Sequence, residues 1–166
     1  MPIFDENTFE FISRGADQTR RIGIRLGKLI QRSDVICLTG ELGSGKTTLV
    51  QGVVRGWGSS EPVTSPTFVL VNSYHLPEGS VLFHLDAYRL KDAMEAIVLD
   101  LDAMLAQGPL VVEWADRILL ALPEERLSIQ MDWLADELRR LEITFRGKRY
   151  EEIFIELKKG ILKSFE

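Results

Sequence analysis

The 166-residue sequence predicts an α/β domain with a mixed β-sheet that is parallel at its centre. The short apolar, largely β-branched run at residues 35–39 precedes a glycine-rich stretch, and apolar residues at helical spacing follow it. Further short apolar runs at residues 81–86 and 110–112 alternate along the chain with segments of helical periodicity. This alternation is typical of a sheet whose parallel strands are covered by helices.

The N-terminal region predicts one strand and one helix. Residues 8–13 alternate apolar and polar side chains around Phe9 and Phe11, the pattern of a half-buried strand. Over residues 17–31, apolar side chains recur on one helical face, at Ile22, Leu26, Leu29 and Ile30. We therefore expect an amphipathic helix before the buried strand at residues 35–39.

A phosphate-binding motif follows that strand. Residues 40–48 read Gly-Glu-Leu-Gly-Ser-Gly-Lys-Thr-Thr and fill the pattern G-x-x-x-x-G-K-[ST]. Glycines let backbone N–H groups turn toward a polyphosphate, and the next helix points its positive end at the same anion. Lys46 is expected at the β/γ-phosphates and the Thr47 hydroxyl at Mg²⁺. We expect the nucleotide to contact Leu42, Gly43, Ser44, Gly45, Lys46, Thr47 and Thr48.

The middle of the chain predicts an antiparallel strand pair. The helix after the motif, marked by Leu49, Val50, Val53, Val54 and Trp57, ends at the glycines, serines and proline of residues 56–62. An apolar run ending near Tyr74 and a second run at residues 81–86 flank a turn at residues 77–80. Strands joined so tightly must be antiparallel.

The C-terminal half predicts a helix, three strands and a last helix. A helix over residues 92–106 would bury Met94, Ile97, Leu101 and Leu105, and a buried strand follows at residues 110–112. Residues 127–133 and 139–145 alternate and predict a second antiparallel pair. The final helix carries its apolar face at Tyr150, Ile153, Phe154, Leu157 and Ile161.

Two acidic residues end strands where a Mg²⁺–nucleotide site needs carboxylates. Asp86 ends the run at 81–86, as the Walker-B aspartate does, and Glu113 ends the run at 110–112. Glu113 would be a second metal ligand or would orient the attacking water; alternatively, either acid caps the next helix. His84 would share a strand face with Asp86 and fits packing or support of the site better than metal binding. Residues 65–67 are either a segment that senses the γ-phosphate or a turn before a strand.

Composition limits the classes of partner. The net charge of −5 disfavours a protein that binds DNA or RNA alone through phosphate contacts. A basic stripe on the first helix (Arg21, Arg25, Lys28 and Arg32) fits a solvated face better than a polyanion site. The sequence shows no signal peptide and no membrane-spanning stretch, and Cys37 sits in a presumed buried strand, so we expect a cytoplasmic protein without membrane contact.

Four ordered segments resemble the TsaE family, the small bacterial ATPases required for threonylcarbamoyladenosine modification of tRNA. They are residues 40–48, residues 63–68 (Val-Thr-Ser-Pro-Thr-Phe), residues 84–90 (His-Leu-Asp-Ala-Tyr-Arg-Leu) and residues 112–114 (Val-Glu-Trp). The resemblance covers about residues 8–146 and implies a P-loop NTPase fold. We expect residues 1–166 to form a single three-layer domain, with a C-terminal helix at about residues 149–163.

The resemblance also implies a site and partners. It implies ATP as ligand, Mg²⁺ held by Thr47 and Glu113, and Asp86 at the nucleotide. It implies that Lys46, Asp86 and Glu113 are catalytic, that residues 65–68 and 113–114 are switch-like, and that the adenine lies near residues 13–19. The implied partner is a TsaB–TsaD complex that modifies the adenosine next to the anticodon, so that tRNA is met only through the complex. Trp114 would be either an exposed contact or part of the core.

A small nucleoside or nucleotide kinase is the alternative. Its phosphate loop reads similarly, but a kinase also needs a lid that supplies arginines. Arg117 and Arg126 sit in a region that could serve, but the segment between them, residues 118–122, is short and apolar. A regulatory GTPase is disfavoured because the chain has no Asn-Lys-x-Asp motif. Phosphate release measured against phosphoryl transfer separates these functions.

Overall fold

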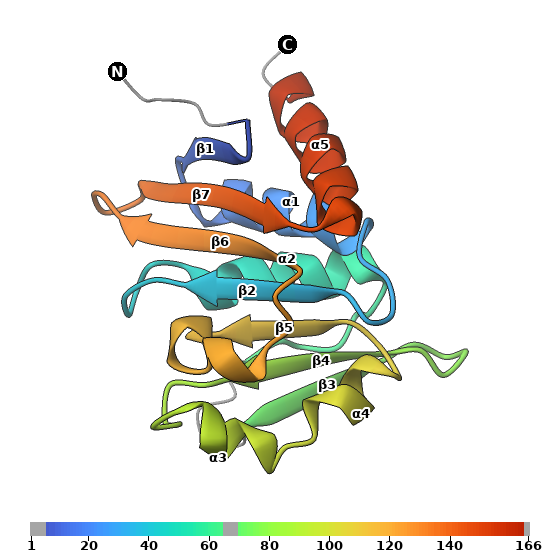
Figure 1. Cartoon of the computed structure of the whole chain (residues 1–166). Coiled ribbons are helices and arrows are strands. Elements are labelled where there is room, and N and C mark those ends of the chain that lie inside the picture. Colours follow the sequence, from blue (N-terminus) through green and yellow to red (C-terminus); the bar gives the residue numbers. More distant parts are fainter. Residues whose placement is uncertain (1–5, 65–69, 165–166) are drawn as a thin grey trace.

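The computed structural model describes residues 6–64 and 70–164, which form a single α/β domain around a seven-stranded sheet. From one edge to the other (Figure 1), the strands are β1 (Thr8–Ser13), β7 (Arg139–Arg146), β6 (Arg126–Trp133), β2 (Val35–Thr39), β5 (Leu110–Glu113), β4 (Val81–Asp86) and β3 (Val71–His75). The central strands β6, β2, β5 and β4 are parallel, and the outer pairs are antiparallel. The predicted α/β class and the centrally parallel sheet are confirmed.

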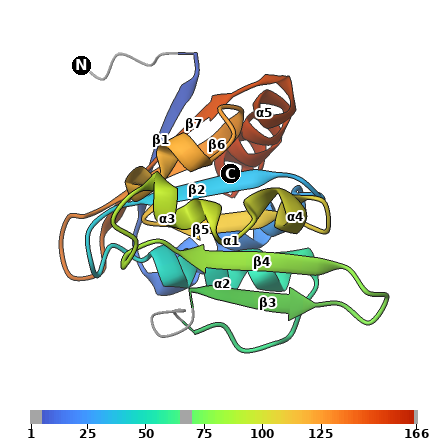
Figure 2. The same cartoon turned by 60° about the horizontal axis from the view of Figure 1, so that its bottom comes forward.

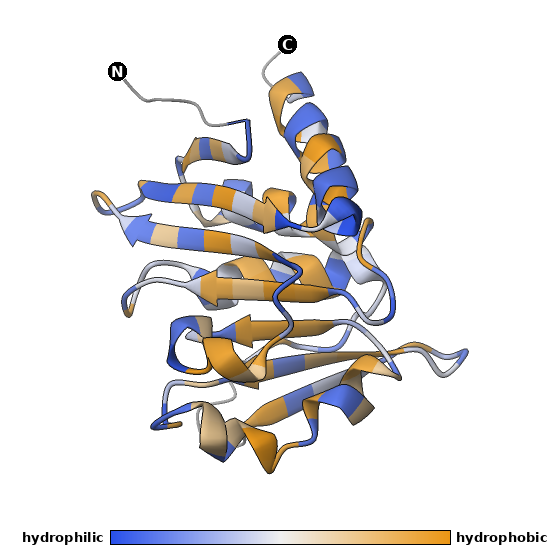
Figure 3. Ribbon diagram, in the orientation of Figure 1, coloured by the Kyte–Doolittle hydropathy of each residue, from blue (hydrophilic) through white to orange (hydrophobic). Residues whose placement is uncertain are grey.

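Helices cover both faces of the sheet (Figures 1 and 2). The helices α1 (Ala16–Gly27) and α2 (Lys46–Trp57) lie on one face, and α3 (Ala93–Ile97) and α4 (Leu101–Leu105) lie on the other. Alternate residues of β2 belong to different cores: Ile36 and Leu38 face α1 and α2, whereas Val35 and Cys37 face the opposite layer. Figure 3 shows β2 and β5 almost continuously hydrophobic, while β6 and β7 alternate. Strands buried on both faces differ in this way from strands buried on one.

Most predicted strands lie where the sequence placed them. β1, β2 and β4 occupy the expected residues, and β3–β4 and β6–β7 are the two predicted antiparallel pairs. Burial raises the pKa of the Cys37 thiol to about 12, so this side chain behaves as a small apolar group, as expected. No helix in the described ranges is long and apolar enough to span a membrane.

The first helix is shorter than predicted. It was expected over residues 17–31, but α1 ends at Gly27 with Lys28 as its C-cap. The backbone N–H of Leu29 bonds to the carbonyl of Leu26, three residues back, which tightens the chain into a turn. This turn buries Ile30 and leads the chain directly to β2. All four residues of the basic stripe are exposed, which agrees with a solvated face.

The prediction of one helix over residues 92–106 was wrong. Two short helices stand there, each capped by an aspartate: Asp92 accepts from the N–H of Glu95, and Asp100 accepts from the N–H of Ala103. Asp100 has a left-handed backbone with φ of 54°, which breaks the helix. The chain therefore changes direction, so that Leu101 and Leu105 are buried but Met94 and Ile97 are exposed. The sequence analysis also missed two 3₁₀ helices, η1 (Ala115–Arg117) and η2 (Leu119–Ala121).

The helices α1 and α2 pack with their backbones in contact. A Cβ added at Gly52 would lie 2.1 Å from the carbonyl oxygen of Arg20, and one at Gly27 would lie 2.1 Å from that of Val53. A Cβ added at Gly23 or Gly56 would lie 2.3 or 2.1 Å from a carbonyl oxygen of the opposite helix. This packing fixes the start of α2, and with it the phosphate-binding motif, against the N-terminal part of the chain.

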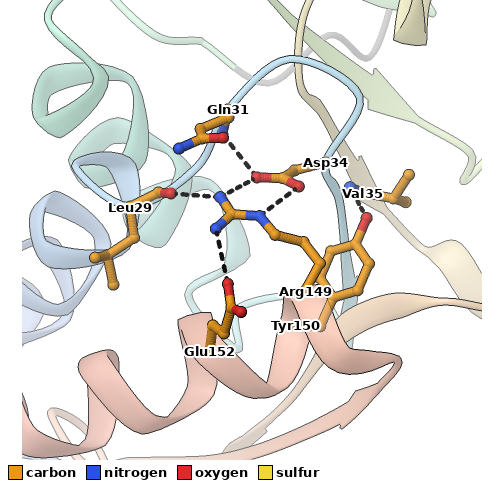
Figure 4. A network of polar contacts seen from close by, with 7 residues as sticks. All are labelled: Leu29, Gln31, Asp34, Val35, Arg149, Tyr150 and Glu152. Atoms are coloured by element: carbon orange, nitrogen blue, oxygen red, sulfur yellow. Dashed lines mark hydrogen bonds and ion pairs between the residues drawn. The ribbon is translucent and has the colours of Figure 1, made fainter.

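The predicted C-terminal helix is α5 (Lys148–Lys163), and a partly buried polar network connects it to the loop before β2 (Figure 4). Arg149 donates to both carboxylate oxygens of Asp34, at 3.1 and 2.8 Å, and to the carbonyl of Leu29 at 2.8 Å. These contacts raise the pKa of Arg149, chiefly through the hydrogen bond to Asp34. The Tyr150 hydroxyl accepts from the N–H of Val35 at 2.9 Å.

Candidate nucleotide-binding site

The candidate site lies where the carboxyl ends of the parallel strands meet. The phosphate-binding loop follows β2, Asp86 ends β4 and Glu113 ends β5, and all three border one cleft of about 330 Å³. Every residue that the sequence placed at the phosphates or the metal, outside residues 65–68, lines this cleft: Leu42, Gly43, Ser44, Gly45, Lys46, Thr47, Thr48, Asp86 and Glu113. Ligands of open α/β sheets bind at this edge because loops and helix N-termini converge there.

The loop has a backbone that only glycine readily adopts at its last position. Gly45 is the N-cap of α2 and has φ of 99°, in the left-handed region. The N–H of Ser44 closes a turn onto the carbonyl of Glu41, and Ser44 is fully buried. The turn leads the chain into α2, whose first N–H groups lack helical partners and border the cleft.

Lys46 is held inside the loop. Its Nζ donates to the carbonyls of Gly40 at 2.6 Å and Glu41 at 2.9 Å, and it lies 4.3 Å from the centre of the Trp114 ring. The residue is 5% exposed, and this burial lowers the pKa of Lys46, an effect that Glu113 and then Asp86 partly oppose. A polyphosphate in the cleft would offer the ammonium group stronger acceptors than these carbonyls.

The two acids lie side by side on the face of the sheet that α2 covers. Asp86 and Glu113 are paired in the β4–β5 register, and both are almost fully buried. The Thr47 hydroxyl donates to Oε1 of Glu113 at 3.2 Å, and the N–H of Tyr88 donates to Oδ1 of Asp86 at 2.9 Å. Asp86 thus caps a turn and not a helix, while the Glu113 carboxylate points to Thr47.

The oxygens at this point suit Mg²⁺. A hydroxyl and carboxylates are the hard ligands that this ion prefers, and Mg²⁺ at a nucleotide typically uses one or two carboxylates together with phosphate oxygens. The described residues contain no group of three or more His, Cys, Asp or Glu side chains able to hold a metal. The donor set around Thr47 therefore fits a metal that is completed by phosphates, and not an all-protein metal centre.

Trp114 closes the cleft at the end of β5. Its backbone is left-handed with φ of 57°, an uncommon conformation for a bulky residue. Its ring packs against Tyr88 with centroids 4.9 Å apart, and the guanidinium of Arg117 lies 5.6 Å from it. Trp114 is only partly buried and packs against the core on the α3–α4 side. It is therefore partly a core residue and partly exposed, so each of the two alternatives from the sequence holds in part.

The sequence analysis missed Arg139 and Tyr88. Arg139, at the start of β7, donates to the carbonyl of Gly43 at 3.1 Å and to three carbonyls in the turn after β6. No local pattern marks it, because the sheet order alone brings β7 beside the loop. Tyr88 lies two residues after Asp86 and could have been found from that spacing.

The sequence analysis also predicted a region for the adenine and a switch segment, and the structure describes only the first of them. A second hollow of about 220 Å³ adjoins the cleft where the adenine was expected, and its lining includes Gly15, Ala16 and Thr19. It shares Gly45, Thr48 and Arg139 with the first cleft. The expected switch segment at residues 65–68 lies outside the described residues, so the structure does not test it.

Comparisons with known proteins identify the family of this chain. The family "Threonylcarbamoyl adenosine biosynthesis protein TsaE" matches residues 13–141. The chain is 42% identical over 137 residues to "tRNA threonylcarbamoyladenosine biosynthesis protein TsaE" of Streptomyces coelicolor (79% of this chain, 93% of that one). It is 37% identical over 142 residues to the protein of the same name from Bacillus subtilis (85% and 88%). The crystal structure of Bacillus subtilis YdiB superposes with a TM-score of 0.78 at 31% identity, covering 92% of this chain and 95% of that one. The chain has the P-loop fold and belongs to the TsaE family.

Proposed function

We propose that this protein is a Mg²⁺-dependent ATPase that acts with a TsaB–TsaD complex in threonylcarbamoyladenosine modification of tRNA, in the cytoplasm. The observation that supports ATP hydrolysis most directly is the meeting of Lys46, Thr47 and Glu113 in one cleft. The names of the relatives support the pathway. The net charge of −5 supports contact with tRNA through the complex, and DNA is not an expected partner.

Each residue would act by a contact that its position allows. The N–H groups at the start of α2 and the Lys46 ammonium would bind the β- and γ-phosphates and stabilise the charge that develops during transfer. Thr47 and Glu113 would hold Mg²⁺, with Asp86 beside them at the nucleotide. When bound, the metal neutralises phosphate charge. The hollow near Gly15 would receive the nucleoside end of ATP.

Of the two arginines that could supply a kinase lid, the geometry brings only one to the cleft. Arg126 begins β6 beside the start of β2, at the opposite end of the parallel strands from the loop, and it donates to the carbonyl of Pro123. Arg117, the other candidate, is near the cleft, where its guanidinium lies over the rings of Tyr88 and Trp114. A lid needs arginines that reach the transferred phosphoryl group from a mobile segment.

Phosphate release with and without the TsaB–TsaD complex tests the proposal. We expect slow release by the protein alone and faster release when the complex is added, because a partner could order the switch-like residues 113–114, which line the cleft. Equal rates despite demonstrated binding would contradict the partner role. Phosphoryl transfer to nucleosides or nucleotides in place of release would favour the kinase.

A further inference from the structure

His84 is a buried polar residue that the proposed reaction does not use directly. Its side chain is fully buried, two residues before Asp86 on β4 and on the same face of the strand. Its Nε2 lies 2.6 Å from Oε2 of Glu113. The ring stacks near that of Tyr74, with centroids 6.4 Å apart.

The role proposed for Glu113 decides which nitrogen of His84 carries the proton. A glutamate that binds Mg²⁺ is ionised and only accepts hydrogen bonds, so with Glu113 in that role Nε2 of His84 donates to it. His84 Nδ1 has no hydrogen-bond partner among the described residues. In the Nε2–H tautomer Nδ1 carries a lone pair and no proton, so no buried N–H lacks an acceptor. This tautomer therefore fits the site.

The two oxygens of Glu113 therefore face different neighbours. Oε2 is bound by His84, while Oε1 lies 3.2 Å from the Thr47 hydroxyl and faces the cleft. A glutamate side chain has several rotamers, and ordering it has an entropic cost. A buried donor on one oxygen restricts the carboxylate to the rotamer in which the other oxygen points at Thr47.

We propose that His84 is a positioning residue, which holds the Glu113 carboxylate toward Thr47 and thereby sets the affinity of the nucleotide site for Mg²⁺. This inference rests on the proposed function, because it assigns Mg²⁺ to Thr47 and Glu113. His84 itself does not touch nucleotide or metal. Outer groups that orient metal ligands typically change metal affinity on the order of 10- to 100-fold when they are replaced.

Two substitutions of similar polarity separate positioning from packing. The side-chain amide of His84→Gln places an N–H near the position of Nε2, whereas the shorter amide of His84→Asn ends near the position of Nδ1 and cannot reach Glu113. For His84→Asn, we expect the Mg²⁺ concentration at which a fluorescent ATP analogue binds most tightly to rise at least about 10-fold. Affinity without Mg²⁺ should stay within about twofold, and His84→Gln should restore the Mg²⁺ requirement of the parent.

The outcomes are distinguishable. A parent protein that binds the analogue with no Mg²⁺ dependence would contradict the proposed function and this inference together. A parent with Mg²⁺ dependence and a His84→Asn variant with the same requirement would overturn the inference alone. Equal impairment of both variants, or a loss of affinity without Mg²⁺, would also overturn it, because His84 would then act only in packing. Melting temperatures of both variants check that each is folded.

Discussion

Replacing Arg149 with Met should loosen the attachment of α5 to the sheet. Met keeps an unbranched stem of similar length but removes the guanidinium that donates to Asp34 and Leu29 (Figure 4). Among the described residues, Asp34, whose side chain is 6% exposed, would keep only the hydrogen bond from the N–H of Gln31 at 2.7 Å. Loss of one partner of a buried ion pair is costly because the other charge stays buried.

The contacts set the size of the effect. Hydrogen bonds to charged groups contribute about 1.5–3 kcal/mol each. The Arg149 side chain is 32% exposed, so water would replace part of what is lost. We therefore expect a decrease of about 2–4 kcal/mol in the free energy of unfolding. For a protein of this size, that corresponds to a decrease in Tm of about 5–15 °C.

Urea unfolding of four proteins measures this effect: the parent, Arg149→Met, Asp34→Asn and the double variant. The double variant should be less destabilised than the sum of the single variants, because residues in direct contact are coupled. Lys159→Met on the same helix is the matched control. Its ion pair with Glu156 is exposed and 3.6 Å long, so its loss should change stability by less than about 0.5 kcal/mol. An Arg149 effect as small as that of Lys159 would refute the reasoning.

Other perturbations test different parts of the molecule. Gly52→Ala should lower Tm by about 5 °C or more, because its Cβ would overlap a backbone carbonyl of α1. The control Gly160→Ala meets only the flexible end of a side chain and should be neutral or stabilising. Equal melting temperatures of the two variants would contradict this. The hydrogen bond from Arg140 lowers the pKa of Asp132. The ionised Asp132 should therefore stabilise the fold fully above about pH 4, and this contribution should decrease as the pH falls through the lowered pKa. Urea titrations of the parent and Asp132→Asn across pH 2–7 check this, and a stability difference between the two proteins that is the same at every pH would contradict it. Trp114→Ala should weaken stimulation by the TsaB–TsaD complex more than nucleotide affinity, and the reverse order would exclude a partner-sensing role.

The strands and the core of the site could be predicted because their signals are local. The phosphate-binding motif specifies a loop between a strand and a helix, and the rule that ligands bind at the carboxyl ends of parallel strands brings Asp86 and Glu113 to it. The register places them side by side, with the Thr47 hydroxyl against Glu113. Periodicity and motif spacing were sufficient for this part of the structure.

The remaining features depend on contacts between distant segments. Arg139 reaches Gly43 from 96 positions away, because the sheet order places β7 near the loop. Helical periodicity over residues 92–106 did not reveal the left-handed backbone at Asp100, which splits that segment into two helices. The contact of His84 with Glu113 also depends on the pairing of β4 with β5. Such features follow from tertiary packing, which single-sequence patterns do not encode.

Phosphate release from Mg²⁺–ATP in the presence of the TsaB–TsaD complex, compared between the parent and Lys46→Ala, tests the central claim most directly. Lys46 lines the cleft in which we propose that the phosphates bind, and its ammonium lies between the Gly40 carbonyl and the Trp114 ring. Removing one such charge-stabilising contact typically lowers kcat on the order of 100- to 1000-fold. We expect Lys46→Ala to fall to near-background release while remaining folded and bound to the complex. Release at the parent rate would contradict the assignment of this cleft as an ATPase site.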